Sequence, residues 1–244
     1  LENKVYLIRD RVGIKPLYWS YQNDEFGFSS ELKGFPDHFK KNKSDKALIQ
    51  FMCLGYIPND SSYYRDIFKL KPAHYLVFDG NSIDIKRYWD LPNNKIHISY
   101  NEAVEETERL LRSSIKYRLL ADLEVGVFLS GGIDSSLVSA IMQQESEKKI
   151  KTFSIGFGDK EYDESVYAKE VSRYIGSEHF EYKFKVTDVI NLINKLDYHF
   201  DEPSGNSASL PMMILSKMTK KEVTVALCGD GGDELFLGYE RYFF

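Results

Sequence analysis

The chain has 244 residues, 43% of them hydrophobic, which is enough to form one large or two small domains with real cores. With 32 basic and 37 acidic residues its net charge is −5, which argues against a nucleic-acid partner, and no apolar run of about 18 or more residues indicates a membrane span. Two widely separated cysteines, Cys53 and Cys228, are typical of a reducing, cytoplasmic compartment, and the five histidines lack metal-ligand spacing.

Residues 1–90 contain several short strand patterns. Apolar stretches at 5–8, 17–19 and 26–28 predict strands, with a polar turn at 22–25 between the last two. Ser44 predicts the N-cap of a helix that ends near Gly55, and within it we expect Cys53 to be a buried apolar residue. Residues 73–78 and 82–89 flank Asp79-Gly80-Asn81, which predicts a hairpin.

The stretch 91–95 is polar and contains Pro92, so we expect a linker at 91–98 between a domain at 1–90 and another at 99–244. Ser99 and Glu102 predict a capping box for a helix that reaches about residue 120. Strand and helix patterns then alternate: strands at 124–129, 151–157, 179–184 and 223–227, the last one buried, and helices at 162–175, 187–197 and 210–218. This alternation predicts a doubly wound parallel sheet that binds ligands at the carboxyl ends of its strands.

The stretch Leu129-Ser130-Gly131-Gly132-Ile133-Asp134-Ser135-Ser136 predicts a strand, a tight turn and a helix capped by Asp134 or Ser135. Both glycines can adopt positive φ, and the N–H groups of the turn and first helical turn can bind one anion, with hydroxyl donors from the three serines. No lysine follows as in a Walker A loop, whereas Asp134 beside a phosphate implies Mg²⁺. The alternative is an ordinary strand-to-helix turn.

A second turn, Cys228-Gly229-Asp230-Gly231-Gly232-Asp233-Glu234, holds three glycines among acidic residues. We expect it to lie against a nucleotide, with Asp233 sharing magnesium with Asp134 and with Asp230 near the reacting atoms. The alternatives are a solvated acidic turn and a calcium loop, but the polar run ends at Leu235, too early for calcium.

The first turn resembles the pyrophosphate loop of the ATP pyrophosphatases, and the whole chain resembles glutamine-dependent asparagine synthetases. The matching stretches are 9–18, 28–34, 55–58, 69–74, 201–203, 228–234 and 238–242. The resemblance implies an α+β remnant of an Ntn-type glutaminase sandwich, followed by an α/β doubly wound sheet of the adenine nucleotide alpha hydrolase type. Ala73 stands where glycine is usual, so a positive φ there would strain the turn.

The resemblance also implies roles for single residues. Leu129, Ile155, Cys228 and Gly229 would contact ATP mainly through backbone, and Ser130, Gly131, Gly132, Asp134, Ser135 and Ser136 would bind pyrophosphate. Asp134 and Asp233 would hold Mg²⁺. Asp230, often glutamate in the family, would accept a proton from attacking ammonia.

The implied activity is that of a carbon–nitrogen ligase of asparagine biosynthesis. Aspartate and ATP would form β-aspartyl-AMP and pyrophosphate, and ammonia from glutamine would then release AMP. A related amidotransferase acting on another carboxylate, such as a surface-polysaccharide sugar acid, and an inactive nucleotide-binding module remain alternatives. The family's amino-terminal cysteine nucleophile is not among these residues, so we expect an internal fragment that does not itself hydrolyse glutamine; a homodimer is compatible with the resemblance.

Overall fold

A computed structural model describes residues 3–58, 60–156 and 163–243. It contains two compact units: Leu1–Lys95 with Asn194–Ser207, and Ile96–Ile193 with Ala208–Phe244. The segment 194–207 therefore groups with the first unit, although the sequence reasoning assigned it to the second domain.

The first unit is built on two antiparallel sheets of three strands each. One has the order β1 (Val5–Ile8), β5 (His74–Phe78), β6 (Ile83–Arg87), and the other has the order β3 (Glu25–Ser29), β2 (Tyr18–Gln22), β4 (Phe68–Lys69). Leu7, Leu70 and Leu76 are buried against aromatic side chains of both sheets, and the rings of Phe26 and Phe78 stack with centroids 4.4 Å apart. The sheets thus share a core, and the expected strands are confirmed.

The hairpin and the turn at Ala73 were both expected from the sequence. Asp79 closes the predicted hairpin by accepting hydrogen bonds from the backbone N–H groups of Asn81 and Ser82, which lower its pKa to about 2. Ala73 is buried at φ +59°, so the strain that the missing glycine implied is present. A 3-10 turn spans Leu32–Gly34.

Helix α1 (Asp45–Leu54) begins as predicted, because Ser44 Oγ accepts a hydrogen bond from Ala47 N. The expectation that Cys53 is buried is wrong: its side chain is exposed. Only the stripe around Ala47 is buried, and a residue six positions later lies about 240° around the helix from it.

The second unit contains a four-stranded parallel sheet with the order β10 (Val225–Leu227), β7 (Val125–Phe128), β8 (Lys151–Gly156), β9 (Glu178–Lys183). Its helices are α2 (Tyr100–Leu119), α3 (Ile133–Glu145), α4 (Ser165–Ile175), α5 (Val186–Ile193), α7 (Ser209–Thr219) and α8 (Gly232–Phe236), followed by a 3-10 turn at Glu240–Phe243. The capping box of α2 forms as predicted, with Ser99 and Glu102 bonded reciprocally.

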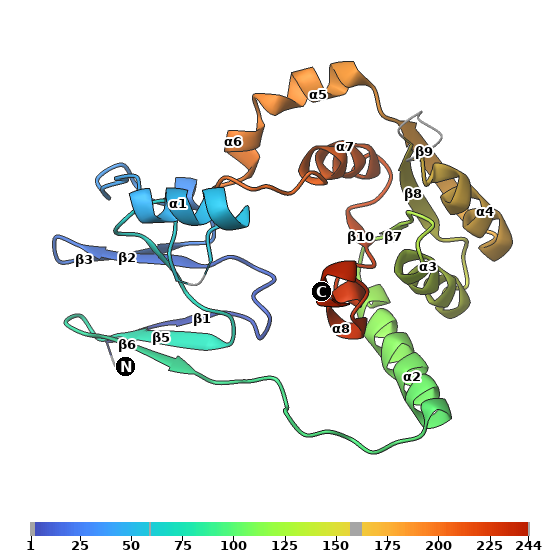
Figure 1. Cartoon of the computed structure of the whole chain (residues 1–244), viewed down its shortest axis with the longest axis horizontal. Coiled ribbons are helices and arrows are strands. Elements are labelled where there is room, and N and C mark those ends of the chain that lie inside the picture. The colour runs from blue at the N-terminus through green and yellow to red at the C-terminus, as the bar shows by residue number, and fades with distance from the viewer. Residues whose placement is uncertain (1–2, 59, 157–162, 244) are drawn as a thin grey trace. The chain divides into compact units, whose positions relative to one another are not determined.

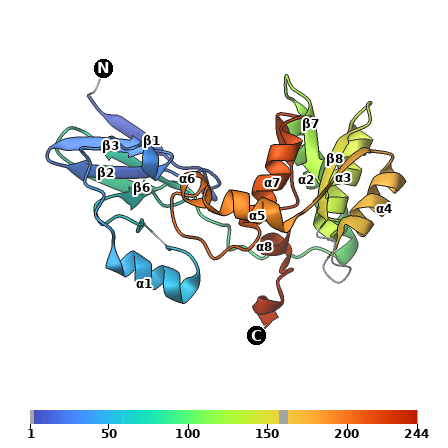
Figure 2. The same cartoon turned by 90° about the horizontal axis from the view of Figure 1, so that it is seen from above.

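Helices cover both faces of this sheet, with α3 and α4 on one side of β7 and β8 and α7 on the other (Figures 1 and 2). Val125 and Val127 of β7 pack with Ile141 and Met142 of α3 on the first face. On the second face, Phe153 of β8 packs against Leu215 of α7. The parallel sheet that the strand–helix alternation predicts is therefore present.

Two expectations about these elements need correction. The strand predicted at 223–227 is shorter and lies at the end of the described sheet, so its Val225 is exposed rather than buried. The helix predicted at 187–197 is interrupted, and α6 (Leu196–His199) follows α5 as a separate turn within the first unit. The predicted strand end at 157 and helix start at 162 lie outside the described residues.

No helix among the described residues is long and apolar enough to cross a membrane.

Candidate functional site

The loop between β7 and α3 is a tight turn that requires glycine at one position. Gly131 has φ +91°, and a Cβ there would lie 2.6 Å from Tyr167 Cβ and 2.7 Å from Ala168 N of α4. A side chain at position 131 would therefore be both strained and overlapping. Gly132, in contrast, has φ −68°, so the positive φ considered for it is not adopted.

Gly132 is the N-cap of α3, and no side chain caps this helix. The prediction that Asp134 or Ser135 is the cap is wrong, because the turn closes earlier and both residues lie in the first helical turn. The backbone N–H groups of that turn have no carbonyl partner within the helix. Such unpaired donors at a helix start are the kind of group that can bind an anion, and anion binding by this turn stays a prediction.

The Ser135 side chain stabilises the loop through hydrogen bonds within it. Its Oγ accepts a hydrogen bond from Ser130 N (3.2 Å), lies 2.9 Å from Ser130 Oγ and lies within donating distance of Gly132 O (3.2 Å). The Ser136 Oγ is buried and has no hydrogen-bond partner in the described part of the chain. The serines thus differ: Ser135 holds the loop in shape, while Ser136 retains an unused hydroxyl.

The acidic turn between β10 and α8 packs directly on the start of α3. A Cβ at Gly229 would lie 2.8 Å from Ser135 N, and a Cβ at Gly232 would overlap Oδ2 of Asp134. The two turns therefore touch, as the sequence predicts, because β7 and β10 are parallel neighbours and end at the same edge. At Gly229 the neighbour is the backbone of α3, and at Gly232 it is the Asp134 side chain, so a side chain at either position would displace the start of α3 or its carboxylate.

Asp134, Asp230 and Asp233 bring three carboxylates to this edge without pairing to any basic side chain in the described ranges. No described group of three or more His, Cys, Asp or Glu side chains is placed to hold a metal by itself. One or two protein carboxylates completed by phosphate oxygens and water are the usual Mg²⁺ ligands in nucleotide sites. The donor set fits a cation that arrives with a phosphorylated ligand.

Cys228 and Asp230 contact each other within the acidic turn. The Cys228 thiol donates a hydrogen bond to Oδ2 of Asp230 (3.1 Å). Partial burial raises the pKa of this thiol; the Asp230 backbone N–H opposes the shift and the Asp230 carboxylate adds to it. The thiol therefore stays protonated at neutral pH and can donate this hydrogen bond.

Leu129 comes directly after β7, and Ile155 lies in the last part of the neighbouring strand β8. Leu129 is 1% exposed and its backbone N–H is bonded to Phe153 O of β8, so its side chain is closed to any ligand. Ile155 is half-buried near the carboxyl end of β8. Any ligand contact by Leu129 must be made by backbone, as the sequence analysis expects.

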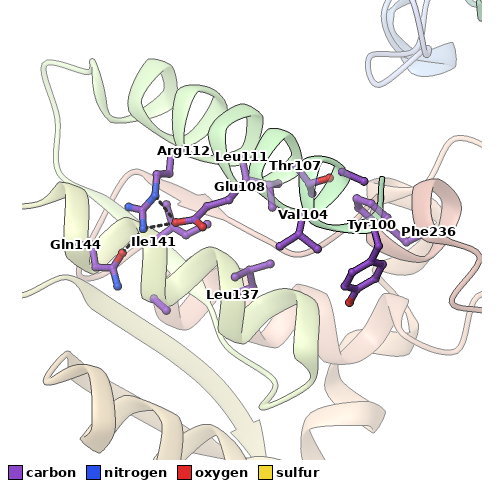
Figure 3. Close-up of a pocket in the computed structure, with 12 residues that line it drawn as sticks. Tyr100, Val104, Thr107, Glu108, Leu111, Arg112, Leu137, Ile141, Gln144 and Phe236 are labelled. Carbon is purple, nitrogen blue, oxygen red and sulfur yellow. Dashed lines mark hydrogen bonds and ion pairs between the residues drawn. The ribbon is translucent and has the colours of Figure 1, made fainter. Parts of the chain in front are cut away.

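Sequence reasoning missed an apolar pocket of about 600 Å³ between α2 and α3 (Figure 3). Val104 and Leu111 of α2 face Leu137 and Ile141 of α3, and Phe236 of α8 lies at one end. The apolar periodicity of both helices indicated their packed faces, but only the tertiary structure shows that these faces leave a cavity. None of the residues expected to bind nucleotide lines it.

Two family models match the chain: "Asparagine synthase" at residues 106–244 and "Glutamine amidotransferase domain" at residues 1–89. The chain is 41% identical over 242 residues to a putative glutamine-hydrolyzing asparagine synthetase 2 of Methanocaldococcus jannaschii, covering 96% of this chain and 47% of that protein. It is 33% identical to the glutamine-hydrolyzing asparagine synthetase 1 of Bacillus subtilis, covering 99% of this chain and 38% of that protein. The chain thus spans about half the length, or less, of these curated relatives.

Among solved structures, the NMN synthetase of Francisella tularensis matches with a TM-score of 0.40 and 20% identity over 59% of each chain. An NH3-dependent NAD synthetase of Campylobacter jejuni matches with a TM-score of 0.38 and 15% identity, covering 58% of this chain and 61% of that one.

Proposed function

The chain belongs to the asparagine synthase family, and we propose that the protein containing it is a glutamine-dependent asparagine synthetase that amidates aspartate with ATP. The observation that carries the proposal is the contact of the two acid-bearing turns, in which Gly229 and Gly232 lie against Ser135 and Asp134. The relatives at 41% and 33% identity are named for this activity.

In this proposal the β-carboxylate of aspartate attacks the α-phosphorus of ATP, and β-aspartyl-AMP and pyrophosphate form. Negative charge grows on the leaving pyrophosphate as the bond breaks. The N–H groups at the start of α3, between Gly131 and Ser136, would therefore bind the transition state more tightly than ground-state ATP. Ser135 contributes by holding the loop in that shape.

Asp134 and Asp233 would hold Mg²⁺, which offsets phosphate charge when it is bound. Each supplies a carboxylate without a basic partner in the described chain, which suits this role. Leu129, Ile155, Cys228 and Gly229 would contact the rest of the nucleotide, mainly through backbone atoms.

Asp230 would act in the second step, when ammonia attacks the acyl carbon and AMP leaves. The attacking nitrogen must lose a proton as the C–N bond forms, and a nearby carboxylate can accept it. Because the Cys228 thiol donates to Oδ2, it fixes the carboxyl group and leaves Oδ1 for this proton.

The finer fold and domain assignments belong to the same proposal. The parallel sheet would be of the adenine nucleotide alpha hydrolase type, within a domain at 99–244 after a linker at 91–98. The two antiparallel sheets would be part of an Ntn-type glutaminase sandwich at 1–90. The match of residues 1–89 to the glutamine amidotransferase domain supports this division, and the free thiols of Cys53 and Cys228 suit the cytoplasm.

The test uses the complete protein with ATP, Mg²⁺ and ammonia and measures pyrophosphate release. We expect release with aspartate and none with uronic acids or without an acceptor. Release with uronic acids but not with aspartate would show that the protein amidates another carboxylate and would refute the proposed substrate.

A further inference from the structure

The segment 194–207 is a part of the chain whose packing the proposed site does not use. It begins after α5 and ends just before α7, two helices of the second unit, yet its residues pack with the first unit. Helix α7 packs Leu215 against Phe153 of β8, and β8 continues to Ile155, which is expected to contact the nucleotide. A movement of segment 194–207 would therefore also move α7, which packs on β8, the strand that carries Ile155.

Three contacts hold the segment on the first unit. The Lys33 ammonium donates to Tyr198 O (2.8 Å) and lies 3.7 Å from the Asp201 carboxylate. At the other end, Gly205 N donates to Gly55 O (2.8 Å), just past the end of α1. Between them is the pair of Lys69 and Glu202.

The Lys69–Glu202 pair is the most enclosed of these contacts. Lys69 Nζ lies 2.8 Å from Glu202 Oε2, and the two side chains are only 12% and 15% exposed. Glu202 Oε1 also accepts from Tyr63 N (3.0 Å), while Lys69 Nζ also donates to Ile57 O (2.6 Å). Each charged group thus has one further hydrogen-bond partner besides the other, which offsets part of the cost of enclosing the pair.

The charge of Glu202 also affects Tyr18, a buried residue of the first unit. Tyr18 of β2 is buried, and burial together with the Glu202 and Asp201 carboxylates raises its pKa. Lys69 lies on β4, the neighbour of β2 in the same sheet. The segment is therefore joined to the sheet itself and not merely to a surface loop.

We propose that Lys69 and Glu202 are a positioning pair that couples glutamine use in the first unit to amide formation at the nucleotide site, by holding residues 194–207 against β4. The proposal rests on the proposed function. Neither residue touches a reacting atom, so the pair acts through the segment that it holds. Its loss should separate the two half-reactions and leave each one intact.

The test compares the complete protein with a double variant that carries Lys69→Met and Glu202→Gln. This variant removes both charges together and so leaves no enclosed charge unpaired, while the new amide oxygen at position 202 can still accept from Tyr63 N. The matched control is Lys71→Met, which removes an exposed pair with Asp60 (3.5 Å, 48% and 59% exposed) two residues away. Gly205→Ala is a second variant that disturbs the contact of the segment without changing any charge, because its Cβ would lie 3.3 Å from Gly55 Cα.

Two quantities are measured: asparagine formed with ammonia, and asparagine formed per glutamate released with glutamine. We expect the second to fall at least about fivefold in the double variant, the lower end of typical coupling between sites, with the first unchanged. Gly205→Ala should change the ratio in the same direction, Lys71→Met should leave it unchanged, and amide hydrogen exchange at 194–207 should accelerate in the double variant.

An unchanged ratio, or an equal fall in both quantities, would overturn the proposal and leave the pair a purely structural contact. If the double variant does not fold, the ratio in Gly205→Ala decides between these outcomes. If the unaltered protein forms no asparagine even with ammonia, the proposed function itself fails, and the coupling role falls with it.

Discussion

The Asp134 carboxylate lies against the Cα of Gly232, so that a Cβ at position 232 would overlap Oδ2 of Asp134. The contact joins the first turn of α3 to the start of α8. These segments are almost a hundred residues apart in sequence, and each carries one of the carboxylates proposed to hold magnesium.

Gly232→Ala should displace Asp134 and lower pyrophosphate release by the complete protein about 100-fold, because small displacements of positioning groups have effects of that size. Position 232 lies in a helix, where alanine is favourable, so the melting temperature should change little. Gly176→Ala is the control: it adds backbone strain at φ +74° but meets no atom within 4 Å, and should keep full activity. Equal activity in both variants would contradict the proposed contact.

Asp134→Asn keeps the shape of the side chain and removes its charge. We expect Mg²⁺-dependent pyrophosphate release to fall about 100-fold or more, since the electrostatic stabilisation of the leaving group is lost. Titration of Mg²⁺ at fixed ATP measures the effect. A variant with unaltered release and unaltered magnesium dependence would remove Asp134 from the proposed metal site.

Replacing a buried alanine by glycine should lower the stability of the first unit at position 47 but not at position 73. Ala47→Gly lies in helix α1, where glycine costs about 0.5–1 kcal/mol in addition to the lost methyl burial. Ala73→Gly loses a similar methyl group but relieves about 1–2 kcal/mol of strain at φ +59°. Hydrogen exchange of first-unit peptides in the complete protein should show destabilisation for Ala47→Gly only; equal losses would contradict the left-handed turn.

His179 should make the second unit less stable in acid. Burial lowers its pKa, with Lys169 acting in the same direction and Glu181 opposing it, and its ring nitrogens lie 2.9 Å from Thr152 Oγ1 and 3.1 Å from Ser154 Oγ. The unfolded state binds the proton more readily than the folded state. The free energy of unfolding is therefore at its full value above pH 6.5, the ordinary pKa of histidine, and decreases as the pH falls from there to the lower pKa of the folded state. Thermal unfolding between about pH 7 and pH 5 should show this loss, and His179→Gln should reduce it; identical slopes would refute it.

Local chemistry explains what the sequence predicts correctly. The Ser99–Glu102 capping box, the Ser44 cap and the Asp79-Gly80 hairpin each depend on neighbours within a few residues. The strand–helix alternation and the shared carboxyl edge likewise follow from period and connection rules. These features place the two acid-bearing turns together before any coordinate is known.

The errors concern properties that distant residues decide. The exposure of Cys53 depends on which stripe of α1 is covered, and that of Val225 on the position of β10 in the sheet. The sequence also gives no sign that 194–207 packs on the first unit, because its partners Lys33, Lys69 and Gly55 lie more than a hundred residues away; its assignment to the domain at 99–244 stays a prediction. No local pattern at 194–207 could reveal those partners.

The most direct measurement of the central claim follows oxygen from aspartate during turnover by the complete protein. With ¹⁸O in the β-carboxylate of aspartate, attack on the α-phosphorus of ATP predicts AMP that carries one labelled oxygen, together with unlabelled pyrophosphate. AMP without label, or formation of ADP and phosphate, would contradict the account.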